Sequence, residues 1–325
     1  EIKTPIIENV DLFKQNIGYE TDVSKEMFSW EDSSKNQLVL KPEMTAPVVR
    51  AYIESGFFRS KPLCKLFYTD ALFRKEKPQK GRQRQFHQFG IEAFGSSEVE
   101  QDVEVILLAT KVLFRLGIDN TTLQINNIGN HETREKYEAK LNGYFSDYKS
   151  QLSKISRNRL NNNSLRILDS KEKEDLKIIK NAPLIKDFLT KDQLNNYTKL
   201  LSHLDALGIS YKENCHLVRG LDYYNGTTFE ITNMSSRSQN ALLGGGRYDY
   251  LVESMGGPST PAVGFAAGIE RLLIESSMED ENERIDFFIG FIDTYAQSAM
   301  KIANQLIDKG YSVHIDTLKK SEKNQ

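Results

Sequence analysis

A ten-residue polar segment between two aromatic segments constrains the fold of this chain more than any other feature of its sequence. The residues that lead up to Phe73 are mostly apolar or aromatic, as expected of a strand. Residues 75–84 are polar and contain Pro78 and Gly81, which are typical turn residues. Apolar and aromatic residues return from Phe86 onward. The sequence therefore predicts a strand, a charged loop and a returning strand.

The predicted loop is basic, and the strand after it carries polar groups on one face. Its five cationic side chains are those of Lys75, Lys77, Lys80, Arg82 and Arg84. At a spacing of two, one face of the returning strand then presents Phe86, Gln88, Gly90 and Glu92. An amide, a gap and a carboxylate beside a basic loop indicate one site for a small polar molecule and a nucleotide.

Three parts of the chain resemble motifs of the histidyl-tRNA synthetases, a family of class II aminoacyl-tRNA synthetases. Residues 71–95, ALFRKEKPQKGRQRQFHQFGIEAFG, resemble motif 2. Residues 217–230, LVRGLDYYNGTTFE, resemble the histidine-specific signature peptide. Residues 244–249, GGGRYD, and 261–272, PAVGFAAGIERL, resemble the later strands and motif 3. The order and spacing of the motifs also match, and the resemblance covers nearly the whole chain.

The resemblance implies an α+β fold, in which an antiparallel sheet with flanking helices is followed by the start of an α/β anticodon-binding domain. The expected domains are a catalytic core with motifs 1 and 2 at 1–129, a helical insertion at 130–212, a catalytic core segment with the signature peptide and motif 3 at 213–278, and a linker with a truncated anticodon-binding domain at 279–325. Helical spacing at 132–145 and 191–207 supports the insertion.

Two further helices are expected from their apolar spacing. Residues 102–117 form an amphipathic pattern that aligns Val105, Leu108, Val112 and Leu116. Residues 285–315 read as strand, helix and strand, with one helix face formed by Met300, Ala303 and Ile307. Such a unit cannot cover both faces of its sheet, so we expect it to be the first part of a larger domain.

The chemistry that the resemblance implies is activation of histidine by ATP. The carboxylate of the amino acid attacks the α-phosphate and pyrophosphate leaves, so the site must hold two anions and neutralise the charge on phosphorus. Arginine suits this task because its guanidinium matches phosphate and stays charged. The resemblance assigns the catalytic roles to Arg74 and Arg219, and the ATP-binding roles to Arg74, Glu76, Arg82, Phe86 and Arg271. For Arg82, a solvated surface position is an equally good interpretation.

Recognition of histidine requires partners for both ring nitrogens. Glu92 is expected to accept from one nitrogen and Tyr224 to address the other, and Gly90 is expected to leave room for the ligand. Glu43, with Thr45 on the same strand face, is expected to hold the ammonium group. Tyr223 and Tyr248 fit a binding role and a core role equally well. The expected histidine-binding set is Glu43, Met44, Thr45, Arg74, Gln88, Glu92, Arg219, Tyr223, Tyr224 and Tyr248.

Gly244, Gly245 and Gly246 precede no Lys-Ser/Thr pair, so a P-loop is rejected. They are expected instead to let the backbone approach the bound adenylate closely. His87 falls on the strand face opposite Gln88, so a structural role is expected for it.

Composition limits the environment and the partners. The two cysteines lie far apart, which predicts a reducing cytoplasm and no disulfide framework or cysteine zinc site. No metal site built from protein side chains is expected, and Mg²⁺ is expected only with ATP. No apolar run approaches the roughly 20 residues that span a bilayer. The net charge is −2 and the pI about 6.3, so RNA contacts must come from local patches such as residues 75–84.

The expected function is ATP-dependent ligation of L-histidine to tRNA(His) through a histidyl-adenylate. The N-terminal residues Pro5, Ile6, Ile7 and Phe13 resemble class II motif 1, which implies a homodimer. One alternative is the regulatory subunit of ATP phosphoribosyltransferase, a histidine-sensing protein with the same catalytic fold. A class II synthetase for another amino acid is a weaker alternative.

Overall fold

The structure is a computed structural model that describes residues 1–17, 21–79, 81–218, 220–234, 241–278 and 285–317. The chain divides into two compact units, Glu1–Ser277 and Met278–Gln325. Each unit is described by itself.

A seven-stranded sheet organises the first unit, in the order β4-β5-β10-β9-β8-β6-β7. Neighbouring strands are antiparallel, except for the parallel pair β6 and β7. The strands are β4 (Cys64–Phe73), β5 (Gln85–Phe94), β6 (Thr121–Asn127), β7 (Tyr211–Glu213), β8 (Asn225–Asn233), β9 (Ala241–Arg247) and β10 (Ala262–Gly268). This mixed α+β architecture with a mostly antiparallel sheet confirms the coarse fold class predicted from the sequence.

The predicted strand, loop and strand are β4, the loop after Phe73, and β5. The two strands pair from Cys64 opposite Phe94 to Phe73 opposite Gln85. The loop closes where the Arg74 amide donates to the Arg84 carbonyl at 2.9 Å. Gly81, with φ of +74°, supplies a left-handed turn within it.

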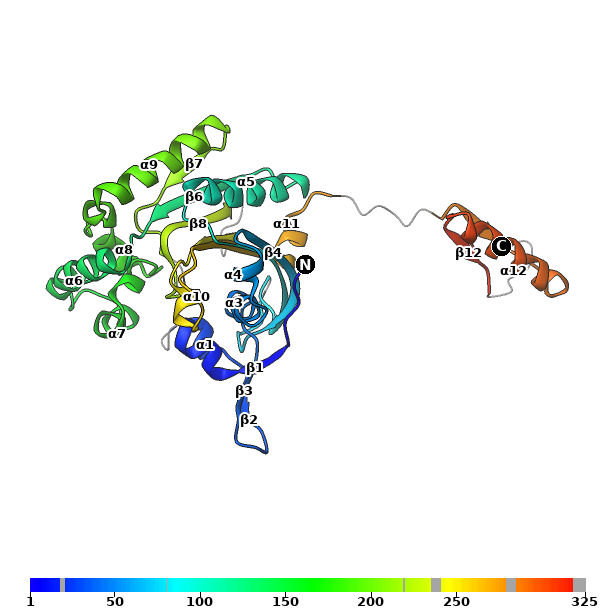
Figure 1. Cartoon of the computed structure of the whole chain (residues 1–325), viewed down its shortest axis with the longest axis horizontal. Coiled ribbons are helices and arrows are strands. Elements are labelled where there is room, and N and C mark those ends of the chain that lie inside the picture. Colours follow the sequence, from blue (N-terminus) through cyan, green and yellow to red (C-terminus); the bar gives the residue numbers. More distant parts are fainter. Residues whose placement is uncertain (18–20, 80, 219, 235–240, 279–284, 318–325) are drawn as a thin grey trace. The chain divides into compact units, whose positions relative to one another are not determined.

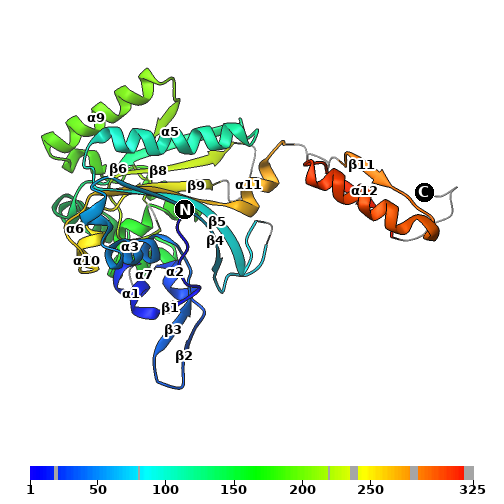
Figure 2. The same ribbon diagram turned by 45° about the vertical axis from the view of Figure 1, so that its right-hand side comes forward.

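Helices cover the sheet on both faces (Figure 2). On one face, α5 (Val99–Arg115) and α9 (Lys191–Ala206) share a hydrophobic cluster with the sheet. On the other face, α3 (Thr45–Glu54) packs against Tyr68 and Phe94. The first unit also contains α4 (Phe57–Ser60), α10 (Leu251–Ser254) and α11 (Ile269–Glu275).

The apolar face predicted for α5 is displaced from the observed one. The side chains that α5 buries include Val105, Ile106, Ala109 and Leu113, whereas Leu108 is 41% exposed. The buried face is set by the positions at which the helix meets β9 and β10, and several spacings of three and four fit this apolar-rich sequence.

A run of helices connects β6 to β7, and it contains the two helices predicted at 132–145 and 191–207. Its members are α6 (His131–Asp147), α7 (Lys154–Asn162), α8 (Lys173–Ile179), the 3₁₀ helices η1 (Ser164–Ile167) and η2 (Ile185–Phe188), and α9. Figure 1 shows α6, α7 and α8 gathered in green at one side of the first unit. Tyr137, Leu141 and Phe145 of α6 belong to the same hydrophobic cluster as α3.

The N-terminal residues form a small antiparallel sheet in the order β1-β3-β2. Its elements are β1 (Ile7–Asn9), β2 (Ser29–Glu31), β3 (Gln37–Leu40) and the helices α1 (Val10–Ile17) and α2 (Asp22–Lys25). Lys41 is fully buried after β3, and its Nζ lies 2.6 Å from Asp70 on β4. This ion pair ties the N-terminal segment to the large sheet.

The second unit contains the predicted strand, helix and strand. The parallel strands β11 (Phe287–Ile289) and β12 (Val313–Ile315) are joined through η3 (Asp293–Tyr295) and α12 (Ala296–Asp308). The predicted helix face is partly wrong, because α12 buries Ala299 and Ala303 while Met300 and Ile307 are about half exposed. None of the helices in the described residues is both long and apolar enough to span a membrane.

Candidate active site

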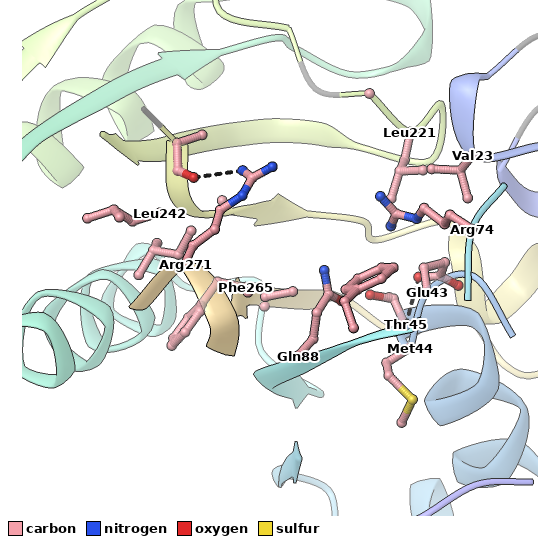
Figure 3. A pocket seen from close by; sticks show the side chains of 18 of the residues that line it. Val23, Glu43, Met44, Thr45, Arg74, Gln88, Leu221, Leu242, Phe265 and Arg271 are labelled. Atoms are coloured by element: carbon pink, nitrogen blue, oxygen red, sulfur yellow. Dashed lines mark hydrogen bonds between the residues drawn. The ribbon is translucent and has the colours of Figure 1, made fainter. Parts of the chain in front are cut away.

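A cavity of about 340 Å³ runs over β5, β9 and β10, a volume typical of small-molecule sites. Motif 2 and motif 3, which lie far apart in the chain, meet there because β5 and β10 are adjacent strands. Figure 3 shows Arg74, Glu43 and Thr45 at one side of the cavity, Arg271 at the other, and Gln88 between them. The predicted residues that line the cavity are Glu43, Met44, Thr45, Arg74, Glu76, Arg82, Phe86, Gln88, Glu92, Tyr223, Tyr224, Tyr248 and Arg271. Arg219, predicted to be catalytic, lies outside the described residues.

Glu92, which lines the cavity, is a buried carboxyl group held by two hydroxyls. The Thr45 hydroxyl donates to its Oε1 at 2.8 Å, and the Tyr248 hydroxyl donates to its Oε2. Glu92 is only 1% exposed, and this burial raises the pKa of its carboxyl to about 8, against the opposing effect of the two hydrogen bonds. Because ionisation of Glu92 is costly in the empty cavity, a hydrogen-bond donor on a bound ligand would stabilise its carboxylate.

Glu43 lies in the turn between β3 and α3, so the prediction that it shares a strand face with Thr45 is wrong. Its carboxylate accepts the backbone N–H groups of Thr45 and Ala46, each at 2.8 Å. These are orphan donors of the first turn of α3, which ordinarily need a partner from outside the helix. Burial raises the pKa of Glu43, while these N–H groups and Arg74 lower it. The helix start therefore fixes a carboxylate at the cavity wall.

Arg74 begins the motif 2 loop and lies against Phe86. Its Nε donates to the Pro42 carbonyl at 2.9 Å, and its guanidinium carbon lies 5.0 Å from the centre of the Phe86 ring. Glu76 lies 3.8 Å from Arg74 and 3.2 Å from the Nε of Arg82. Burial lowers the pKa of Arg74, but a guanidinium remains charged. The guanidinium groups of Arg74 and Arg82 therefore both line the cavity, and the carboxylate of Glu76 lies between them.

Arg271 on α11 links the motif 2 loop to β9. Its Nε donates to the Gly81 carbonyl at 3.1 Å. Its Nη1 donates to the Ala241 carbonyl at 2.9 Å, the dashed line at Arg271 in Figure 3. The neighbouring Glu270 accepts from the backbone N–H and ring Nδ1 of His87, both at 2.9 Å. His87 does not line the cavity, in agreement with its predicted place on the opposite strand face.

Three tyrosines form one wall of the cavity. The ring centres of Tyr223 and Tyr224 lie 4.8 Å apart, and those of Tyr223 and Tyr248 lie 5.7 Å apart. The sequence left Tyr248 open between a core and a binding role. Its side chain is 1% exposed, its hydroxyl donates to Glu92 and it lines the cavity, so the binding role stays a prediction. Burial raises the pKa of Tyr223 and Tyr248 well above the ordinary value, so both are neutral donors.

Met44 faces the hydrophobic core as well as the cavity. Its side chain is 1% exposed, and its sulfur lies 3.8 Å from the Thr4 hydroxyl. In Figure 3 this side chain points away from Arg74. The predicted binding residue therefore contributes mainly packing beneath the site.

Two of the glycines leave space for neighbouring protein atoms. A Cβ at Gly90 would lie 2.2 Å from the Tyr68 hydroxyl, so Gly90 makes room for a tyrosine. A Cβ at Gly245 would lie 2.2 Å from the Gly264 carbonyl, so this glycine permits close strand packing. Of the three consecutive glycines, only Gly244 lines the cavity.

Several residues that line the cavity, among them Glu26, Gln83, Glu270 and Tyr68, were missed by sequence reasoning. Tyr68 is the one with a buried polar atom without a hydrogen-bond partner among the described residues. Its side chain is fully buried. The signal was a tyrosine on β4 directly opposite Gly90, where the missing side chain leaves room for its hydroxyl.

Comparisons with known proteins identify the family of this chain. The family model described as histidyl-tRNA synthetase matches residues 1–272. A protein of Picosynechococcus sp. named histidine–tRNA ligase is 46% identical over 320 residues, which cover 97% of this chain and 75% of that protein.

Solved structures with a similar fold belong to the same family. The apo histidyl-tRNA synthetase of S. aureus is 33% identical, with a TM-score of 0.79, over 100% of this chain and 78% of that one. A Bacillus halodurans structure titled as an ATP phosphoribosyltransferase regulatory subunit/histidyl-tRNA synthetase is 25% identical, with a TM-score of 0.69, over 97% and 83%. With a family model matched along most of its length and relatives this similar, the chain belongs to the histidyl-tRNA synthetase family.

Proposed function

We propose that this protein is a histidine–tRNA ligase that forms histidyl-adenylate from L-histidine and ATP in the described cavity and transfers histidine to tRNA(His). The observation that carries the proposal is Glu92. A buried carboxyl held by Thr45 and Tyr248 lies in the same cavity as three arginines, Arg74, Arg82 and Arg271. One part of the cavity suits an imidazole and another suits a triphosphate.

Glu92 accepts a ring N–H of histidine, and the hydroxyl of Tyr224 addresses the other ring nitrogen. An amino acid without that donor would leave the buried carboxyl unpaired, which gives strong discrimination. Glu43 and Gln88 hold the ammonium group near Arg74. The Tyr68 hydroxyl is available to a polar atom of the ligand.

Arg74 draws the histidine carboxylate and the α-phosphate together. One carboxylate oxygen forms a bond to the α-phosphorus, the bond from that phosphorus to the bridging oxygen breaks, and pyrophosphate leaves with the electron pair. Arg82 and Arg271 hold the departing phosphates, and Phe86 lies beneath the adenine. The signature peptide supplies Arg219 as a further cation by its resemblance to the family motif. No proton transfer is needed in this step, so positioned charge provides the catalysis.

Mg²⁺ fits this site as a companion of ATP. No cluster of three or more metal-ligating side chains occurs among the residues that the structure describes. Mg²⁺ is commonly held by substrate phosphates with one or two carboxylates, and Glu76, which lines the cavity, would be one of them. When bound, Mg²⁺ supplies charge neutralisation of the triphosphate.

We also propose the finer domain roles. Residues 130–212 form the helical insertion, residues 213–278 complete the catalytic core, and the α/β unit after residue 279 contacts the anticodon. The basic loop at 75–84 reaches the acceptor end of tRNA through phosphate contacts. The cytoplasmic location stays a prediction from cysteine usage.

We also propose a homodimer, which the exposed apolar residues at the N-terminal segment support. Ile6 is 45% exposed and Ile7 51%, while Phe13 is fully buried and serves the local core instead. An isologous contact across this segment would cover both isoleucines. Sedimentation at micromolar protein is expected to give a dimer that Ile7→Asp weakens; a wild-type monomer would contradict the prediction.

The test of the proposed ligase is charging of tRNA(His) transcripts with labelled histidine. Histidyl-tRNA should accumulate in the presence of ATP and should be absent with Glu92→Ala. The regulatory-subunit alternative predicts histidine binding without charging and without turnover of ATP.

A further inference from the structure

The helical segment at 130–212 holds the signature peptide in place, although none of its described residues lines the cavity. The part of the peptide that does line the cavity includes Gly220, Leu221, Tyr223 and Tyr224. Its other side faces α6 and η1. The peptide is therefore fixed from outside the site.

Arg134 on α6 binds backbone carbonyls of the signature peptide. Its Nη1 donates to the Asp222 carbonyl at 3.1 Å and to the Tyr224 carbonyl at 3.0 Å. The side chain is 21% exposed, and its Nη2 lies 3.7 Å from Glu138, one turn further along α6. The start of α6 is itself capped, because the Asn130 side chain accepts the Thr133 N–H at 3.0 Å.

Arg166 on η1 also binds the signature peptide, at residues that precede Tyr223. Its Nη2 donates to the Gly220 carbonyl at 2.9 Å and to Oδ1 of Asp222 at 3.1 Å. The backbone carbonyl of Arg166 in turn accepts from Arg159 on α7 at 2.7 Å. The Arg166 side chain is 13% exposed and that of Asp222 34%, so this ion pair is partly buried.

The two arginines together fix alternate residues of the peptide. They bind the backbone of Gly220, Asp222 and Tyr224, and Asp222 is held through both its carbonyl and its carboxylate. Val218 and Leu221 pack against the hydrophobic cluster that contains Leu165 of η1. A shift of α6 or η1 would therefore displace the tyrosine wall that faces Glu92.

We propose that Arg134 and Arg166 are positioning residues for histidine recognition and adenylate formation, and that through them the insertion sets the geometry of the active site. The inference rests on the proposed function. Each guanidinium makes two hydrogen bonds from one nitrogen to separate acceptors. The two N–H groups of that nitrogen point in fixed directions within the guanidinium plane, whereas a lysine ammonium is a freely rotating point charge on a differently shaped side chain.

The experiment compares Arg134→Met, Arg166→Met and the double variant with the wild type in histidine-dependent pyrophosphate–ATP exchange. Arg157→Met, an exposed arginine of α7, is the matched control. Loss of charge-assisted hydrogen bonds is expected to lower kcat/KM for histidine roughly tenfold to a hundredfold, with a smaller change in KM for ATP. Arg134→Lys should fall between Arg134→Met and the wild type.

Thermal unfolding of each variant separates positioning from a merely structural role. Folded variants with an unchanged KM for histidine and unchanged kcat would overturn the inference, as would a fall in the active fraction alone. If a methionine variant does not fold, Arg134→Lys and Arg166→Lys carry the test: full wild-type kinetics in both would refute the inference. A wild type without histidine-dependent exchange would instead refute the proposed function.

Discussion

Glu92→Gln should stabilise the empty protein in mildly alkaline solution. The carboxyl pKa is raised from 4.5 to about 8 by burial. Between these values the unfolded chain loses the proton and the folded chain keeps it, so stability contributed by this group is complete below pH 4.5 and falls until about pH 8. At about 1.4 kcal/mol per pKa unit, the cost above pH 8 is on the order of 5 kcal/mol. Glutamine has the same shape and never ionises, so it removes that cost.

The same substitution should nearly abolish the use of histidine. The amide cannot become the charged acceptor for an imidazole N–H, and a hydrogen bond to a charged group contributes about 1.5–3 kcal/mol. We therefore expect kcat/KM for histidine to fall by roughly 10- to 150-fold, with KM for ATP little changed. A gain in stability together with a loss of function would show that the Glu92 carboxyl costs stability in the empty protein and is needed for binding.

Urea unfolding at pH 6 and pH 8.5 measures the first effect, and steady-state pyrophosphate exchange measures the second. Glu253→Gln, at an exposed position on α10, is the matched control and should change neither quantity. The reasoning is refuted if Glu92→Gln is less stable than the wild type at pH 8.5 and equally active with histidine.

Three further substitutions test other parts of the site. Arg74→Lys keeps the charge but loses the fork beside Phe86, and single-turnover adenylate formation should slow by about 100-fold or more. Arg219→Ala should raise the barrier to adenylate formation by about 3–4 kcal/mol, by analogy with loss of an oxyanion-hole donor, while histidine still binds. A fall of less than tenfold in the single-turnover rate would reject the role assigned to Arg219. Arg247→Met should destabilise the fold by about 3–5 kcal/mol, measured by thermal unfolding, because it leaves Asp102, now 2.7 Å from the guanidinium, buried and unpaired. An unchanged Tm would contradict that account.

Motifs with local geometry were predictable from the sequence. A strand, a turn with Gly81 and a returning strand require only alternation and turn chemistry, and β4 and β5 confirm them. The same alternation places Gln88 and Glu92 on one face, and both line the cavity.

Features that depend on tertiary packing were not predictable. The role of Gly90 is set by the tyrosine across the strand pair, and its sequence position alone suggested room for a ligand. The capping of α3 by Glu43 depends on where β3 ends. The buried face of α5 depends on the sheet beneath it, because Leu108 and Ile106 are equally apolar in sequence.

The central claim is that one cavity selects histidine and couples it to ATP. The most direct measurement is exchange of labelled pyrophosphate into ATP by the purified protein, with each of the twenty amino acids supplied in turn. Exchange should depend on histidine and be lost with Glu92→Ala. Exchange with another amino acid, or none with histidine, would contradict the account.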